Sequence, residues 1–166
     1  MIIVVLGLPG SGKSYFASRL SKELQAKYLS SDVIRKQLFS FLEYSKQEKI
    51  KVYEVMMKEM IRAIKQSVNI VLDATFYEEN LREKFMDTAV SFEERILFVE
   101  VWADQKTIQE RLKLKRAYSD ADYSVYLHIK EIFEPLKAEH LKIQSTQSNI
   151  EEMIKEALKY IQNCHG

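Results

Sequence analysis

The stretch Gly7-Leu8-Pro9-Gly10-Ser11-Gly12-Lys13-Ser14 decides how the rest of this sequence is interpreted. It matches the phosphate-binding pattern G-x-x-x-x-G-K-[S/T] at every fixed position, and those positions are Gly7, Gly12, Lys13 and Ser14. The chain has only four glycines, and three of them lie in this stretch. Glycine is therefore concentrated where a tightly turned loop needs it.

Apolar residues lie on both sides of this loop. The run Ile-Ile-Val-Val-Leu at 2–6 predicts a buried strand. After the loop, Phe16, Ala17, Leu20 and Leu24 recur at helical spacing. The loop thus joins a strand to a helix, as a phosphate-binding loop of this kind requires.

The chemistry of the loop follows from its atoms. Glycines let successive backbone N–H groups turn inward around phosphate oxygens, and the positive end of the following helix adds to the attraction. Lys13 is expected to reach the β- and γ-phosphates, and the Ser14 hydroxyl to ligate Mg²⁺. The residues expected to bind the nucleotide are Gly7, Pro9, Gly10, Ser11, Gly12, Lys13, Ser14 and Tyr15.

Composition limits the class of protein. A single cysteine in 166 residues excludes an internal disulfide framework and suits a reducing compartment. The formal net charge of +1 provides no global field that would attract nucleic acid. The first apolar run is too short for a signal sequence or a membrane span. We expect a cytoplasmic protein without membrane attachment, and nothing in the sequence indicates an obligate protein partner.

Strand and helix patterns alternate along the whole chain. Further strands are predicted at 26–29, 69–73, 95–102 and, more weakly, 140–145. The helices are predicted to begin near Ser31, at the capping boxes Ser45–Glu48, Thr75–Glu78 and Ser148–Glu151, and at Asp104 and Asp122. This order implies an α/β fold in one domain, residues 1–166, with a parallel sheet, helices on both faces and ligands at the carboxyl ends of the strands.

The long helix after Ser45 carries an apolar stripe. The stripe contains Ile50, Tyr53, Met57, either Met60 or Ile61, and Ile64. The methionines of this helix are interpreted as core residues, and the alternative is an adaptable acceptor pocket lined by Met56, Met57 and Met60.

Asp73 ends the strand at 69–73, which a parallel sheet brings close to the first strand. A carboxylate at this point can hold Mg²⁺ directly or through water. The alternative is that Asp73 merely caps the helix that follows Thr75.

Asp32 and Arg35 follow the second strand and share one face of the next helix. Facing the loop across a cleft, Asp32 would take a proton from an acceptor hydroxyl and Arg35 would hold an acceptor or phosphoryl oxygen. An ordinary ion pair within the helix is the alternative interpretation of the same spacing.

Arg111 and Arg116 lie on a helix that the sequence Ser119-Asp120-Ala121-Asp122 separates from the next one. They are candidates for a lid at about 104–134 that neutralises charge on the transferring phosphoryl group. A solvated basic helix face is the alternative.

These motifs together resemble one known family, the P-loop predicted kinases, often grouped as AAA-type ATP-binding kinases. This family is related to 5′-hydroxyl polynucleotide kinases, zeta toxins, gluconate kinases and chloramphenicol phosphotransferases. The resemblance runs from residue 2 to about 137 and rests on Gly7–Ser14, Ser31–Arg35, Leu72–Thr75, Arg111 with Arg116, and Ser119–Asp122 with Pro135.

The resemblance implies a three-layer, P-loop nucleotide kinase-like fold, a five-stranded parallel sheet of order 2-3-1-4-5 and an arginine-bearing helical lid. It also implies that Lys13, Asp32, Arg35, Arg111 and Arg116 are catalytic, and that Ser14 and Asp73 bind the metal.

The function that this implies is an ATP- and Mg²⁺-dependent phosphotransferase with an alcohol acceptor, most simply a small molecule. A 5′-hydroxyl polynucleotide kinase is the alternative within this class, with a nucleic acid 5′ end as acceptor. The alternative from another class is a P-loop ATPase or switch without a small-molecule acceptor. The sequence lacks the Asn-Lys-x-Asp motif of guanine recognition and the switch glycine two residues after Ala74, and their absence favours adenine and opposes a GTPase switch.

Overall fold

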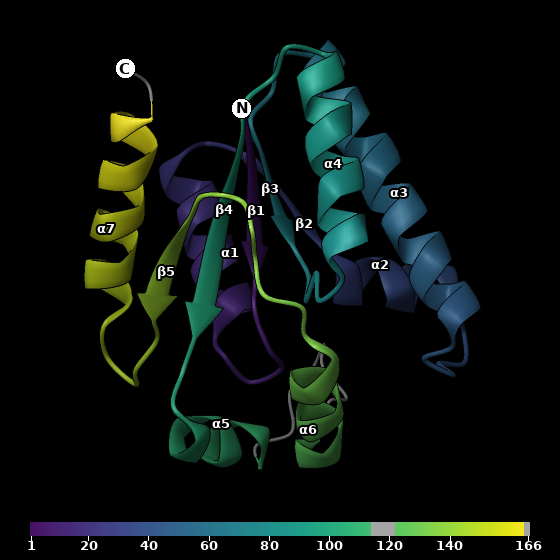
Figure 1. Ribbon diagram of the computed structural model, residues 1–166, viewed down its shortest axis with the longest axis vertical. Helices are drawn as coiled ribbons and strands as arrows, with labels where there is room; N and C mark the ends of the chain where they lie inside the picture. The colour runs from purple at the N-terminus through teal and green to yellow at the C-terminus, as the bar shows by residue number, and fades with distance from the viewer. Residues whose placement is uncertain (114–121, 165–166) are drawn as a thin grey trace.

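The computed structural model describes residues 1–113 and 122–164 and shows a sheet between two layers of helices (Figure 1). The strands are β1 (Ile2–Leu6), β2 (Lys27–Ser30), β3 (Ile70–Asp73), β4 (Ile96–Trp102) and β5 (His140–Gln144). The helices are α1 (Lys13–Glu23), α2 (Ser31–Leu38), α3 (Lys46–Lys65), α4 (Glu79–Ser91), α5 (Gln105–Leu112), α6 (Tyr123–Ile132) and α7 (Ile150–Asn163).

The five strands are all parallel and follow the order β2-β3-β1-β4-β5, which confirms the predicted fold class and strand order. Asp73 lies beside Val5 of β1 on one side and beside Ser30 of β2 on the other. The loop after β1, the end of β3 and the start of α2 therefore meet at one edge of the sheet.

A separate hydrophobic core covers each face of the sheet, and β1 is therefore buried on both faces. Val4 and Leu6 pack with α3 and α4 on one face, whereas Ile3 and Val5 pack with α1 and α7 on the other. Figure 1 shows this division, with α5 and α6 lying beyond the carboxyl ends of the strands. A strand buried on both faces reads as a continuous apolar run, which is the pattern at 2–6.

Two predicted capping boxes are wrong. Helix α4 begins at Glu79 and not after Thr75, because Phe76 adopts a left-handed φ of 45° and its ring is fully buried. That ring packs against Tyr53 and Phe85, at centroid distances of 5.1 and 5.2 Å, so the chain turns into the core before the helix starts.

The last helix departs from its predicted start in a similar way. Asn149, and not Ser148, is the N-cap residue of α7. The Asn149 side chain accepts a hydrogen bond from the Thr146 N–H at 2.8 Å and donates one to the Gln144 carbonyl at 2.9 Å. The Asn149 side chain therefore stabilises the turn between β5 and α7 and makes no capping hydrogen bond to the helix.

Helix α3 has the predicted N-cap but a different buried face. The Ser45 hydroxyl accepts a hydrogen bond from the Glu48 N–H at 3.2 Å. Val52, Met56 and Met60 are fully buried, whereas Ile50 is half exposed. The interpretation of Met56 and Met60 as core residues is confirmed, and the predicted stripe is displaced because Ile50 faces outward.

Among residues 1–113 and 122–164, no helix is both long enough and apolar enough to cross a membrane.

The buried face of α3 leads to a paired prediction. Met56→Ala removes a fully buried side chain and should lower the free energy of unfolding by about 2–5 kcal/mol. Ile50→Ala removes a side chain of similar size that is half exposed, so its cost should stay below about 1 kcal/mol. Urea unfolding of the two variants measures both values. Equal losses would contradict the helix orientation described above.

Candidate active site

The loop between β1 and α1 has the backbone conformation that only glycine adopts easily. Gly7 has a φ of 149° and Gly12 a φ of 92°. A Cβ atom on Gly7 would overlap the carbonyl oxygen of Val101 in β4, so the loop packs directly against the neighbouring strand. Gly12 is the N-cap of α1, which begins at Lys13 and points its first turn at the loop. This arrangement suits a phosphate group.

Asp73 is the most deeply buried acid at this edge of the sheet, with 1% of its surface exposed. Burial is the main cause that raises the pKa of Asp73, whereas Lys13, the Tyr28 hydroxyl and the Ser14 hydroxyl lower it. Its Oδ2 atom accepts a hydrogen bond from the Tyr28 hydroxyl at 2.7 Å. Its Oδ1 atom is buried without a hydrogen-bond partner among the described residues. A carboxyl oxygen without a hydrogen-bond partner beside Ser14 fits a metal ligand.

The residues at this point fit Mg²⁺ better than zinc. The described part of the chain contains no cluster of three or more His, Cys, Asp or Glu side chains suited to a metal. Mg²⁺ usually takes one or two protein oxygens and completes its shell with water and substrate phosphates. Ser14 and Asp73 provide that minimal set.

Tyr28 is a site residue that the sequence analysis included only as part of the predicted strand at 26–29. It points from β2 toward the end of β3, because residues 28 and 71 are neighbours in register and Asp73 lies two positions further along the same face. Burial and the Asp73 carboxylate raise the pKa of Tyr28, so its hydroxyl remains a proton donor. The strand register was the missing information.

Asp32 and Arg35 line the same cavity as the loop. This cavity, of about 300 Å³, also contains Lys13, Ser14 and Asp73 on its wall. No ion pair joins Asp32 to Arg35 in the described structure, and Arg35 pairs instead with Glu48, at 3.3 Å from Nη1 to Oε2. The ion pair within the helix, the alternative left open by the sequence, is therefore not formed.

The far wall of this cavity comes from side chains to which the sequence analysis gave no role in the site. Lys49 and Tyr53 come from α3, and Thr75 and Tyr77 from the segment after β3. Helix α6 covers the cavity with apolar and imidazole side chains, which belong to Val125, His128 and Ile129.

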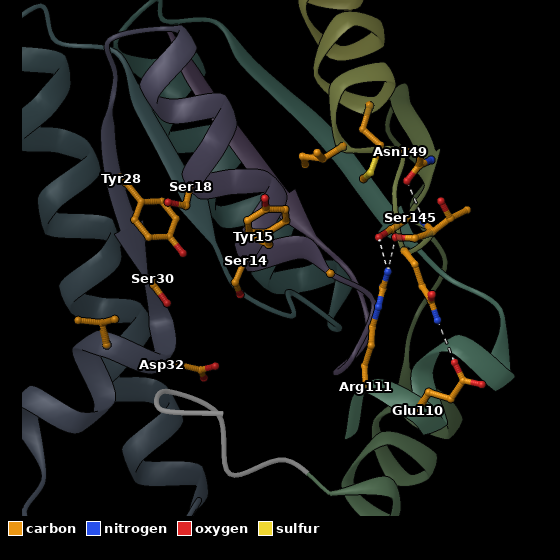
Figure 2. A pocket seen from close by; sticks show the side chains of 16 residues that line it. Ser14, Tyr15, Ser18, Tyr28, Ser30, Asp32, Glu110, Arg111, Ser145 and Asn149 are labelled. Carbon is orange, nitrogen blue, oxygen red and sulfur yellow. Dashed lines mark hydrogen bonds between the residues drawn. The ribbon is translucent and has the colours of Figure 1, made fainter. Parts of the chain in front are cut away.

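A second cavity, of about 880 Å³, extends from the loop toward the turn after β5 (Figure 2). The two cavities meet at Gly12, Ser14 and Asp32. Tyr15, Thr146 and Asn149 also line the larger one. A nucleotide whose phosphates lie in the loop would have its base and sugar in this space.

Arg111 lies in the larger cavity and is fixed there. Its guanidinium donates hydrogen bonds to the carbonyls of Gly10 and Ser11, at 3.3 and 3.0 Å, and to the hydroxyl of Ser145, at 3.0 Å. A fourth, of 2.6 Å, reaches the Thr146 carbonyl. Figure 2 shows Arg111 directed toward Ser145, across the cavity from Asp32. In this structure Arg111 braces the loop and lines the larger cavity, and its role as a lid arginine stays a prediction. Arg116 lies outside the described residues.

The chain is similar to several kinases. A cytidylate kinase from Sulfurisphaera tokodaii is 37% identical over 81 residues, and this match spans 45% of each protein. The structure resembles a gluconokinase from Sinorhizobium meliloti, with a TM-score of 0.75, 17% identity and coverage of 98% of this chain and 91% of that one.

A second similar structure is the Mycobacterium tuberculosis APS kinase CysC in complex with AMPPNP and APS. It has a TM-score of 0.72 and 19% identity, and the match covers 97% of this chain and 96% of that one. At these identities the two structural likenesses establish the fold alone. The family follows from the sequence match: residues 2–136 fit the model of the AAA domain family, and the chain belongs to that family.

Proposed function

We propose that this protein is an ATP- and Mg²⁺-dependent kinase that transfers the γ-phosphate to the hydroxyl group of a small molecule. The observation that carries the proposal is the shared cavity of about 300 Å³. Lys13, Ser14 and Asp73 lie on its donor side, and Asp32 and Arg35 lie on the side where an acceptor would bind. The similarity to cytidylate kinase, gluconokinase and APS kinase supports the same class of reaction.

On the donor side, the backbone N–H groups of residues 7–14 and the Lys13 ammonium group bind the phosphates. The adenosine part occupies the cavity of about 880 Å³ beside Tyr15 and Asn149. Arg111 acts as a positioning residue here, because its hydrogen bonds to Gly10, Ser11, Ser145 and Thr146 tie the loop to the turn after β5. Ser14 and Asp73 would hold Mg²⁺, which supplies charge neutralisation at the phosphates.

On the acceptor side, Asp32 accepts the proton of the attacking hydroxyl. The acceptor oxygen then forms a bond to the γ-phosphorus while the bond from that phosphorus to the bridging oxygen breaks, and ADP leaves with the electron pair. Arg35 lines the same cavity, and its guanidinium group can hold an oxygen of the acceptor.

The whole chain, residues 1–166, acts in this proposal as one kinase domain. Helices α5 and α6 form its lid, within the range 104–134, because α6 contributes Val125, His128 and Ile129 to the cavity that also holds Lys13 and Asp32. Arg116 remains the candidate for the lid arginine that stabilises the transferring phosphoryl group.

Removing the base tests the acceptor side. Asp32→Asn keeps the shape of the side chain but cannot take a proton, so kcat should fall about 10²–10⁴-fold with ATP affinity almost unchanged. Transfer from labelled ATP to alcohols measures kcat, and AMPPNP titration measures affinity. Asp87→Asn, an exposed change of the same kind, is the control. Full activity of Asp32→Asn would remove Asp32 from the mechanism.

Tyr28 provides a test of the metal site. Tyr28→Phe removes the hydrogen bond that orients Asp73, so the Mg²⁺ concentration for half-saturation should rise about tenfold. Mn²⁺ binding to the AMPPNP complex, followed by electron paramagnetic resonance, should weaken in parallel. Tyr160→Phe, which changes a tyrosine of α7 outside both cavities, is the matched control. Unchanged metal binding would show that Asp73 does not depend on Tyr28.

The raised pKa of Asp73 predicts a cost in stability. Because the folded protein binds this proton more tightly than the unfolded chain, the ionised carboxylate lowers stability above the folded pKa, and the loss disappears as the pH falls through that pKa. Without ligand, Asp73→Asn should therefore raise the melting temperature at pH 7, and the gain should shrink at acid pH. A melting temperature lowered equally at every pH would contradict this.

A further inference from the structure

We infer that the acceptor of this kinase is an uncharged alcohol with an aromatic or otherwise planar ring. The inference rests on the kinase proposal above and identifies the substrate class of the same site. It comes from the charges and rings on the acceptor side of the cavity of about 300 Å³. Two cations, Arg35 and Lys49, lie on that wall, and each is already neutralised by a glutamate behind it.

The positive charge of Arg35 is neutralised by the carboxylate of Glu48. Arg35 pairs with Glu48 at 3.3 Å, and the two side chains are only 13% and 7% exposed. Glu48 also accepts hydrogen bonds from the backbone N–H groups of Glu43, at 2.8 Å, and Tyr44, at 2.9 Å. These bonds and Arg35 hold the pKa of Glu48 below its usual range. Glu48 is thus ionised and tied to the backbone, and it stays beside Arg35 when a ligand enters.

The second cation is held by three neighbouring groups. Lys49 forms an ion pair with Glu78 and donates a hydrogen bond to the Tyr77 hydroxyl at 2.7 Å. Its ammonium nitrogen also lies 4.0 Å from the centre of the Tyr77 ring. An anionic acceptor would have to compete with the carboxylate of Glu78 for this charge.

The remaining charges near the acceptor oppose an anion. Asp32 and Asp73 line the same cavity, and Lys13 is committed to the phosphates of the donor. A phosphate or carboxylate on the acceptor would therefore face acids, while Arg35 and Lys49 are already paired and the remaining basic group of the described wall is the imidazole of His128. Like charges brought together in this way oppose binding, so the cavity discriminates between two ligands that differ in one charge.

What the wall does offer is ring surface and apolar side chains. Tyr44, Tyr53 and Tyr77 present aromatic rings, and Val125 and Ile129 of α6 close the cavity with apolar groups. A planar ring fits between such side chains, and the small volume limits the acceptor to about the size of a nucleoside.

Matched pairs of alcohols that differ only in charge test the inference. The pairs are the four ribonucleosides with their 3′-monophosphates, and hydroxymethylbenzamide with hydroxymethylbenzoate. Binding to the Mg²⁺–AMPPNP complex is measured by calorimetry, and transfer from ATP is measured separately. We expect uncharged members to bind, each at least about tenfold more tightly than its charged partner. Tighter binding of the charged members, or no binding by any uncharged member, would overturn the inference.

One substitution leaves the charge of Lys49 unpaired and changes a residue that does not line the cavity. Glu78→Gln removes the charge that neutralises Lys49, and Glu78 makes no side-chain cap to α4, so the fold should be retained. The charged members should then gain about two- to fivefold in affinity while the uncharged members change little. Glu83→Gln, an exposed change on the same helix, should alter neither. Equal effects of the two variants on the charged members would contradict the role of Glu78.

The two measurements separate this inference from the function on which it rests. Binding of uncharged members without phosphoryl transfer from ATP would contradict the kinase proposal and leave the acceptor class standing. Transfer that prefers the 3′-monophosphates would support the kinase, overturn the acceptor class and favour a nucleic acid end as substrate.

Discussion

The rest of the site depends on one buried carboxylate, that of Asp73, between the phosphate-binding loop and the second strand. Burial of a charge is costly unless other groups compensate it, and here the compensation comes from Lys13 and from the Tyr28 hydroxyl. The oxygen of Asp73 that has no partner among the described residues is the one left for a cation. Ionisation of Asp73 would place an unfavourable charge here, which binding of the proposed Mg²⁺ and nucleotide would relieve.

The strand order explains why donor and acceptor groups meet. With β3 between β2 and β1, the segment that carries Asp32, the acid Asp73 and the loop leave the sheet side by side at its carboxyl edge. In open parallel sheets, ligands bind in the crevice outside the carboxyl ends of the strands, at the point where the strand order reverses. Helices α3 and α6 then close the cavity from above the same edge, so residues distant in sequence surround one small space.

The sequence predicted the fold well because its signals are local: a glycine loop, apolar runs on either side and polar residues at strand ends. It failed where tertiary contacts decide. Phe76 is buried in the core, so α4 begins at Glu79 and not after Thr75, and no local sequence pattern predicts this. The capping box correctly placed Glu48 at the start of α3. The ion pair between Glu48 and Arg35 depends on the packing of α2 against α3, which no local pattern predicts. The hydrogen bond from Tyr28 to Asp73 depends on the strand register. The position of Arg111 depends on its hydrogen bond to Thr146, 35 residues further along the chain.

In the function that we propose, one cavity brings a nucleotide and an alcohol together for direct phosphoryl transfer. Phosphorus NMR of the protein with ATP, Mg²⁺ and the uncharged alcohols tests this transfer, because it resolves every phosphorus-containing product. We expect a phosphomonoester signal that grows in equal amount with ADP. Formation of ADP with inorganic phosphate alone, at a rate that no alcohol alters, would contradict it and indicate an ATPase.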